Sequence, residues 1–376
     1  MLTRFEVENF KNFKDKLIVD FTKVGGYQFN KDCISNDLVG KMLIYGKNAV
    51  GKTNLGEAII DIKRTLDGIQ YTTESSFLNV DSTEDYASFV YEFNIEKKQI
   101  IYKYSKYGNN KLRDEELFLD GTRIFSCGKN LSQSTFENLH MIQAENVDLQ
   151  RYKELVSNDA DKFEIRIPFL RYLMGFVPFS GESVMRRMEK YVRTMEKIAL
   201  PSRAIDRRGR ILSFLEDKKE LNRLERFLSY MGIPCKLKTE RLPDGRIELY
   251  FENNRLIPFF QNASSGTLAL FNVYEEILAF RQPVSFLYID EFDANYHYEM
   301  ARNLIHFLKE EYPECQVILT THNTNLMSNR LLRPDCLFIL SSDGKLTALC
   351  DATERELREG HNLEKMYISG EFAKYE

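Results

Sequence analysis

The chain has 376 residues, of which 43% are hydrophobic and 29% charged, and its formal net charge is −4. This length suffices for a large core and two structural units, and the charge balance argues against a protein coated in nucleic acid. No signal-like N-terminus and no apolar run of about 18 residues is present, so neither secretion nor membrane insertion is predicted. The six cysteines include no C-x-x-C pair. A cytoplasmic protein without a zinc site or disulfide framework is therefore expected.

The first third of the chain is predicted to consist mainly of strands. Residues 2–9 and 17–21 carry strand-like apolar patterns and are expected to pair antiparallel around a turn at Lys11 and Asn12. Residues 41–45 are a short apolar strand, and apolar positions from 55 to 66 keep helical spacing up to Gly68. Residues 87–104 and 116–119 then alternate apolar and polar side chains. They are expected to form a meandering antiparallel arm.

The middle of the chain is predicted to be helical from about residue 130 to 232. Residues 151–232 contain 18 Lys plus Arg against 12 Asp plus Glu, a net charge of +6. The arginines are densest at Arg186, Arg187, Arg193, Arg203, Arg207, Arg208 and Arg210. A solvated helical face and a surface for nucleic acid or an acidic partner both remain open. Strands at 247–251, 286–289, 317–319 and 337–340 and helices at 267–280 and 298–311 are predicted to follow.

The most specific motif is GKNAVGKT at residues 46–53, which has the spacing of a phosphate-binding loop. Its glycines let the backbone curl so that N–H groups face phosphate oxygens, and the following helix adds its N-terminal partial charge. Lys52 can reach the β- and γ-phosphates, and the Thr53 hydroxyl can ligate Mg²⁺. The predicted nucleotide contacts are Gly46, Lys47, Asn48, Ala49, Val50, Gly51, Lys52, Thr53 and Asn54.

Three polar residues follow buried strands in the second half of the chain. Asp290 ends the strand at 286–289 and is placed to hold Mg²⁺. Glu291 beside it is placed to orient or deprotonate an attacking water, and His322 can donate to the γ-phosphate. Surface carboxylates and a structural histidine are the ordinary interpretation of each residue alone. Their order after a phosphate-binding loop favours a nucleotide-hydrolysing site.

Together these motifs resemble ABC-type ATPases of the SMC-like and OLD-like branch. Residues 46–53 match Walker A, 286–291 match Walker B with its catalytic glutamate, and His322 matches the switch histidine. The turn containing Ser264, Ser265 and Gly266 resembles a signature motif without its leading leucine and second glycine. The resemblance implies an α/β fold: a P-loop NTPase of ABC-ATPase type with an antiparallel β arm and a helical insertion.

The same resemblance supplies further candidates. That branch opens with a strand and an aromatic turn, so Lys11 and Asn12 are nucleotide-binding candidates. Gln143 is the candidate for the glutamine that couples Mg²⁺ to the inserted domain, with a surface polar residue as the alternative. Asp293 and Asn295 lie where the D-loop would be.

The resemblance also implies domains and an assembly. Residues 1–135 would form the first half of the nucleotide-binding domain, 136–235 a basic helical insertion, and 236–376 the second half. Because the chain carries one set of motifs, a working site requires a homodimer or higher homo-oligomer. ATP and Mg²⁺ would close this assembly and hydrolysis would open it.

The expected function follows from the same resemblance. No nuclease domain and no long heptad region accompany the motifs, which favours action on a separate protein. Small ATPases of this type serve in bacterial antiphage defence. They include the ATPases of PARIS systems, to which this chain is similar in part through the stretch Tyr27–Asn30. The expected role is sensor and regulator of an effector, a nuclease or toxin, with a phage-encoded trigger. The alternatives are a DNA-repair or recombination ATPase clamping nucleic acid through the insertion, and a scaffold, which the intact Glu291 disfavours.

Overall fold

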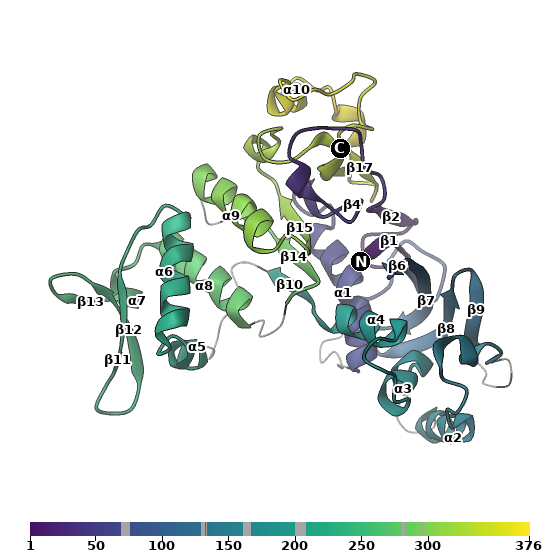
Figure 1. Ribbon diagram of the computed structural model, residues 1–376. Helices are drawn as coiled ribbons and strands as arrows, with labels where there is room; N and C mark the ends of the chain where they lie inside the picture. The colour runs from purple at the N-terminus through teal and green to yellow at the C-terminus, as the bar shows by residue number, and fades with distance from the viewer. Residues whose placement is uncertain are drawn as a thin grey trace.

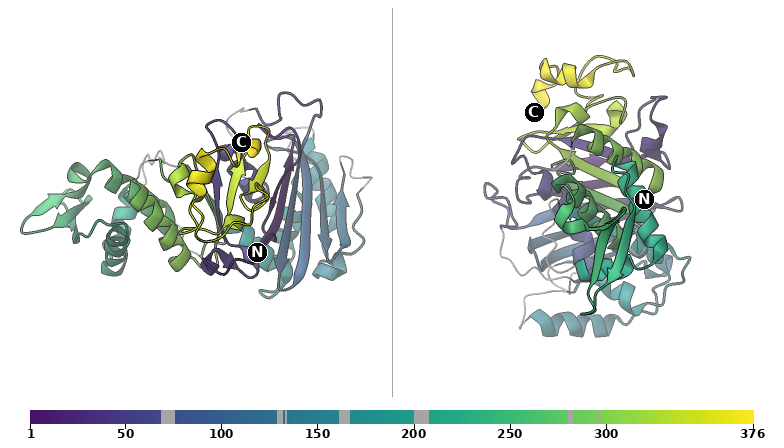
Figure 2. Two further views of the ribbon diagram at one scale, coloured as in Figure 1. Left: turned by 90° about the horizontal axis from the view of Figure 1, so that it is seen from above. Right: turned by 90° about the vertical axis from the view of Figure 1, so that its left-hand side faces the viewer.

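The computed structural model describes residues 1–68, 76–128, 132, 134–160, 167–199, 208–279, 283–294 and 297–376. It is a mixed α/β protein in which two six-stranded sheets lie side by side and a smaller lobe projects from them (Figure 1). In Figure 2 the lobe projects to the left in the left panel and points toward the viewer in the right panel. No helix within the described ranges is long and apolar enough to span a bilayer.

The core sheet has the strand order β10-β14-β15-β5-β16-β17. Its strands are β5 (Lys41–Tyr45), β10 (Met195–Ala199), β14 (Phe286–Asp290), β15 (Gln316–Thr321), β16 (Leu337–Leu340) and β17 (Leu346–Ala348). All neighbouring pairs are parallel except β16 and β17. The four central strands are buried along their whole length, as their continuous apolar runs predict. Parallel pairing brings the carboxyl ends of these strands to one edge.

The antiparallel sheet has the order β2-β1-β6-β7-β8-β9. Its strands are β1 (Leu2–Glu8), β2 (Leu17–Asp20), β6 (Ala87–Ile95), β7 (Lys98–Gly108), β8 (Lys111–Leu119) and β9 (Thr122–Cys127). The predicted N-terminal pair and the predicted arm are thus one sheet, because β1 pairs with β6. A further short pair is formed by β3 (Ile34–Ser35) and β4 (Leu38–Val39).

Helix α1 (Lys52–Asp67) packs between the two sheets. Tyr288 of the core sheet donates its hydroxyl to the carbonyl of Lys52, and Tyr91 of the antiparallel sheet donates to the carbonyl of Ala58 at 2.7 Å. The helix ends at Gly68, whose φ of 69° lies in the left-handed region that glycine adopts at helix ends. The helix that starts in the phosphate-binding loop is therefore held from both sides.

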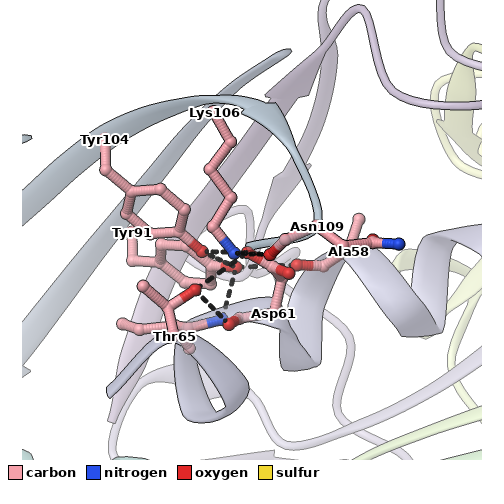
Figure 3. Close-up of polar contacts among 8 residues, drawn as sticks. Ala58, Asp61, Thr65, Tyr91, Tyr104, Lys106 and Asn109 are labelled. Atoms are coloured by element: carbon pink, nitrogen blue, oxygen red, sulfur yellow. Dashed lines mark hydrogen bonds and ion pairs between the residues drawn. The ribbon is translucent and has the colours of Figure 1, made fainter. Parts of the chain in front are cut away.

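A buried ion pair fastens α1 to the antiparallel sheet (Figure 3). The ammonium of Lys106 lies 2.6 Å from Asp61 Oδ2, and both side chains are almost completely buried. The same carboxylate oxygen accepts a hydrogen bond of 2.8 Å from the Tyr104 hydroxyl. Buried charges persist only where such partners replace water, so the pair depends on all of these contacts at once.

The helices between residues 136 and 235 lie in two places. They are α2 (Leu149–Ala160), α3 (Phe169–Phe176), α4 (Val184–Arg193), α5 (Arg208–Phe214) and α6 (Lys218–Tyr230). Helices α3 and α4 contact α1, whereas α5 and α6 contact strands of the smaller lobe. Strand β10, which the sequence did not predict, follows α4 and joins the core sheet. The boundaries 1–135, 136–235 and 236–376 stay a prediction.

The smaller lobe combines these two helices with a three-stranded sheet. Its remaining elements are β11 (Leu237–Arg241), β12 (Ile247–Glu252), β13 (Leu256–Pro258), α7 (Phe259–Asn262) and α8 (Ser265–Ala279). Phe307 of α9 (Tyr298–Glu311) contacts the rings of Phe227 and Tyr230 in α6 at 5.0 and 5.8 Å. These aromatic contacts join the lobe to the core. Helix α10 (Leu363–Ile368) follows β17.

Candidate nucleotide-binding site

The predicted phosphate-binding loop connects β5 to α1. Gly51 precedes the helix with a φ of 105°, and Ala49 also has a positive φ, of 65°. A side chain at Gly46 would approach Val50 Cγ2 at 2.8 Å and the Leu340 carbonyl at 3.2 Å, so only glycine fits there. The loop tip, made by Lys47, Asn48 and Ala49, is exposed. The local backbone therefore has the curled form that the motif predicts.

Lys52 folds back into this loop. Its ammonium donates to the carbonyl oxygens of Gly46 at 2.7 Å and Lys47 at 2.9 Å, and the residue is only 5% exposed. Burial lowers the pKa of Lys52, and the charges of Glu291 and Asp290 oppose that shift. A cation with little water around it, held by two carbonyls, can exchange those carbonyls for phosphate oxygens.

Asp290 is held by two hydroxyl groups at the end of β14. Its Oδ2 accepts from Thr53 Oγ1 at 2.5 Å, and its Oδ1 accepts from Thr320 Oγ1 at 2.7 Å. Thr320 Oγ1 also accepts from the backbone N–H of Glu291 at 2.9 Å. A hydroxyl and a carboxylate are the hard oxygen donors that Mg²⁺ prefers, so Thr53 and Asp290 fit this ion. Thr320 was not predicted as a site residue from the sequence, although it immediately precedes Thr321 and His322.

Glu291 and His322 lie at the same edge of the core sheet. Glu291 has a φ of 47°, an uncommon conformation for a residue other than glycine and one found at functional sites. His322 is exposed and follows Thr321, whose carbonyl accepts from the Gly46 N–H at 3.2 Å. The fold thus brings both residues beside the loop, although their catalytic roles stay a prediction.

The turn after β1 leans against the loop. Asn12 donates to the Ala49 carbonyl at 3.4 Å and accepts from the Asn54 side-chain amide. Lys11 does not contact the loop within the described residues, but pairs with Glu57, one helical turn beyond Thr53. Asn12 therefore lies against the loop, whereas Lys11 pairs with a side chain on the flank of α1. Their roles in nucleotide binding stay predictions.

The signature-like turn lies in the smaller lobe, apart from α1 (Figure 1). Ser264 precedes α8 and caps it, accepting from the backbone N–H of Thr267 at 3.1 Å. Ser265 and Gly266 form the first turn of that helix. One chain therefore does not bring this turn to its own phosphate-binding loop.

The remaining candidates are less connected to the site. Gln143 is exposed and follows a short helix, Leu139–Ile142, with a φ of 60°. Within the described ranges no hydrogen bond joins its side chain to Thr53 or Asp290, so its coupling role stays a prediction. Asp293 is buried, and among the described residues its Oδ1 has no hydrogen-bond partner. Asn295 lies outside the described residues.

The C-terminal segment approaches the loop, which the sequence did not predict. Glu376 pairs with Lys47 at 2.5 Å, and the rings of Tyr367 and Tyr45 meet at 4.8 Å. Burial, followed by hydrogen bonds with Tyr45 and Glu376, raises the pKa of Tyr367. Both partners of this segment flank Gly46, the first residue of the loop.

A glycine loop between a parallel strand and a helix, with a lysine at the start of the helix and an aspartate facing it, defines a P-loop NTPase. Residues 41–328 match the family described as "AAA domain, putative AbiEii toxin, Type IV TA system", and the chain belongs to that family. No curated protein sequence matches the chain.

Solved structures with a distant likeness include heads of SMC proteins. An SMC head bound to the C-terminal winged-helix domain of ScpA is 17% identical, with a TM-score of 0.47 over 93% of this chain and 97% of that one. The SMC head of Thermotoga maritima is 16% identical (TM-score 0.45, coverage 92% and 98%). An SMC head of Pyrococcus yayanosii with a coiled coil and joint is 13% identical (TM-score 0.48, coverage 93% and 98%). At these TM-scores the likeness is too distant to support a functional argument.

Proposed function

We propose that this protein binds ATP with Mg²⁺, hydrolyses the nucleotide within a homodimer or higher homo-oligomer, and thereby controls a separate effector in antiphage defence. The observation that carries the hydrolytic part is the contact between Thr53 and Asp290 beside the buried ammonium of Lys52. These three groups come from α1 and β14, whose relative position the buried core fixes. They are the groups that a metal-dependent phosphoryl transfer requires.

Each residue has a defined task in this proposal. Lys52 turns from the loop carbonyls to phosphate oxygens, and the N–H groups of the loop donate to the same oxygens. Thr53 and Asp290 hold Mg²⁺, which supplies positive charge against the phosphate oxygens when it is bound. Glu291 orients a water at the sheet edge and accepts its proton, and exposed His322 donates a hydrogen bond to the terminal phosphate.

The proposed assembly follows from the separation of the phosphate-binding loop and the signature-like turn within one chain. Because Ser264, Ser265 and Gly266 belong to the smaller lobe, they are free to meet the loop of a second chain. In a head-to-tail pair each nucleotide would then lie between the loop of one chain and α8 of the other. The N-terminus of α8 offers N–H donors and a partial positive charge to the phosphates.

The proposed role in antiphage defence concerns the biological setting of the ATPase. Its support is the family description, which names a toxin and a type IV toxin–antitoxin system. The stretch Tyr27–Asn30 and its similarity to PARIS ATPases point the same way. The effector would be a nuclease or toxin, its release would follow a phage-encoded trigger, and the setting would be the cytoplasm.

The DNA-clamp alternative receives less support from the basic segment. Arg186 forms an ion pair with Glu189, and Arg193 lies 3.6 Å from the same carboxylate. Arg187 pairs with Glu96 at 2.9 Å. Arginines already neutralised by carboxylates add little to a phosphate-binding surface. Outside the described residues lie Arg203, Arg207 and the side chains of Arg208 and Arg210.

The test is the size of the Glu291→Gln protein by light scattering, with and without ATP and Mg²⁺. We expect this variant to bind ATP, because the residues that hold the nucleotide are unchanged. It should accumulate as the closed assembly, because glutamine cannot take the proton from the attacking water. A rise in mass or compaction of an existing oligomer is the expected result. Turnover at the wild-type rate would refute the role of Glu291. ATP binding without any change in size would refute the paired site.

A further inference from the structure

Two lysines fasten the core-sheet strand β10 to helix α1, one from each side. Lys63 of α1 donates to the Met195 carbonyl at 2.9 Å and contacts Glu196 at 2.6 Å. In the opposite direction, Lys197 of β10 reaches the helix. The two lysines have similarly small side-chain exposures, 17% and 11%. The interface between β10 and α1 thus contains two lysine contacts of the same kind. Lys197 makes the contact near the phosphate-binding loop, and Lys63 makes the one farther from it.

The contact made by Lys197 lies at the phosphate-binding end of α1. Its ammonium donates to the Thr53 carbonyl at 3.2 Å and lies 3.7 Å from Glu57 Oε1. Thr53 is the same residue whose hydroxyl donates to Asp290. The hydrogen bond from Lys197 to this carbonyl therefore holds the backbone that carries the hydroxyl.

Pairing in the sheet explains why Lys197 reaches this place. In the parallel register, Lys197 stands opposite Tyr288, and Ala199 stands opposite Asp290. Side chains two residues apart share a face of the sheet, so Lys197 lies on the face that Tyr288 and Asp290 turn toward α1. Tyr288 donates to the Lys52 carbonyl from that face. Consecutive carbonyls at the start of α1 are therefore each held by a side chain from a neighbouring strand.

Glu57 links this contact to the N-terminal turn. It lies between Lys11 and Lys197, one lysine at each carboxylate oxygen. Burial acts to raise the pKa of Glu57, but the hydrogen bond from Lys11 and the charge of Lys197 lower it overall. Burial lowers the pKa of Lys197, against the charges of Glu57 and then Asp290. The carboxylate is thus ionised, and it holds both cations against the first turns of the helix.

We propose that Lys197 is a positioning residue for the magnesium and phosphate site: by holding the Thr53 carbonyl and Glu57 it keeps the Thr53 hydroxyl at Asp290. This inference rests on the proposed ATPase function. Lys197 touches neither nucleotide nor metal in this role and acts through Thr53. Since β10 follows directly from α4, a displacement of the helical segment α3–α4 would reach the site through this residue.

The test compares three variants of the full chain. Lys197→Met removes the ammonium and keeps the stem, Lys197→Arg restores a cation, and Lys63→Met removes the matched contact at the far end of the interface. The readout is the affinity for a fluorescent ATP analogue, measured with Mg²⁺ and again with EDTA. The affinity with Mg²⁺ divided by the affinity in EDTA is called the magnesium gain.

We expect Lys197→Met to reduce this gain by at least about tenfold, the effect of losing one hydrogen bond from a charged donor. The affinity in EDTA should stay close to that of the wild type, and Lys197→Arg should recover most of the gain. Lys63→Met should lower the thermal midpoint and leave the gain unchanged. Hydrolysis should follow the same order, with kcat falling more than KM rises.

Two results would overturn the inference. One is an unchanged magnesium gain in a folded Lys197→Met protein, and the other is an equal loss in Lys63→Met, which would indicate a general loosening of β10. A wild-type chain that binds no nucleotide would instead refute the proposed function. The two failures are therefore distinguishable.

Discussion

Gly56 gives the sharpest structural prediction, because α1 can touch the core sheet only without a side chain at this position. A Cβ added there would lie 2.5 and 2.6 Å from two ring atoms of Tyr288, against the 3.4 Å at which ordinary contact begins. Tyr288 is fully buried and its hydroxyl donates to the Lys52 carbonyl. Neither the ring nor the helix can give way without disturbing the start of α1.

The Gly56→Ala change therefore sets two effects against each other. Alanine favours a helix over glycine by about 1 kcal/mol. Overpacking a buried site costs roughly 1–3 kcal/mol, and a contact this short belongs at the upper end. We expect a net loss of about 1–2 kcal/mol in the free energy of unfolding. Because the displaced ring carries the hydroxyl that holds Lys52, affinity for ATP should fall as well.

The assay is urea unfolding followed by circular dichroism, combined with nucleotide binding. Gly175→Ala is the matched control, since Gly175 lies in helix α3, and outside that helix no atom of the described residues comes within 4 Å of an added Cβ. It should stabilise the protein by a few tenths to about 1 kcal/mol. A Gly56→Ala protein as stable as the Gly175→Ala protein would refute the packing argument.

Two further predictions concern charged side chains. Lys106→Met leaves the buried carboxylate of Asp61 without its cation and should cost about 3–5 kcal/mol in urea unfolding. Adding Asp61→Asn should recover much of this loss, and an equally unstable double variant would contradict the assignment. Lys52→Ala should weaken ATP binding by at least about tenfold, the loss of one charge-assisted contact, with little change in thermal midpoint. Unchanged ATP binding in a folded Lys52→Ala protein would mean that the loop does not hold phosphate.

Much of the core could be predicted because its signals are local. The buried strand at 41–45, the glycine loop and the helix up to Gly68 are contiguous in sequence, and the structure confirms them. Asp290, Glu291 and His322 could be assigned to one edge, since parallel strands all end there. Residues 298–311 form a helix with the predicted bounds.

What the sequence left open depends on contacts between distant segments. Residues 195–199 include Glu196 and Lys197 and directly follow a helix, so the short strand β10 carries no distinct periodicity. Asp61 and Lys106 are separated by 45 positions and become a pair only when α1 meets the antiparallel sheet. The signature-like serines lie at the start of α8 in the smaller lobe, so their proposed role depends on a second chain, which no pattern within one sequence specifies.

The contacts between Glu376 and Lys47 and between Tyr367 and Tyr45 have a practical consequence for experiments. A purification tag or dye attached at residue 376 would sit against the loop expected to receive the nucleotide. A tag there would disturb the ion pair between Lys47 and the Glu376 carboxylate, and would thereby change the measured affinity for the nucleotide. A small environment-sensitive dye, introduced through a cysteine at the same position, would instead report the arrival of ligand by its emission.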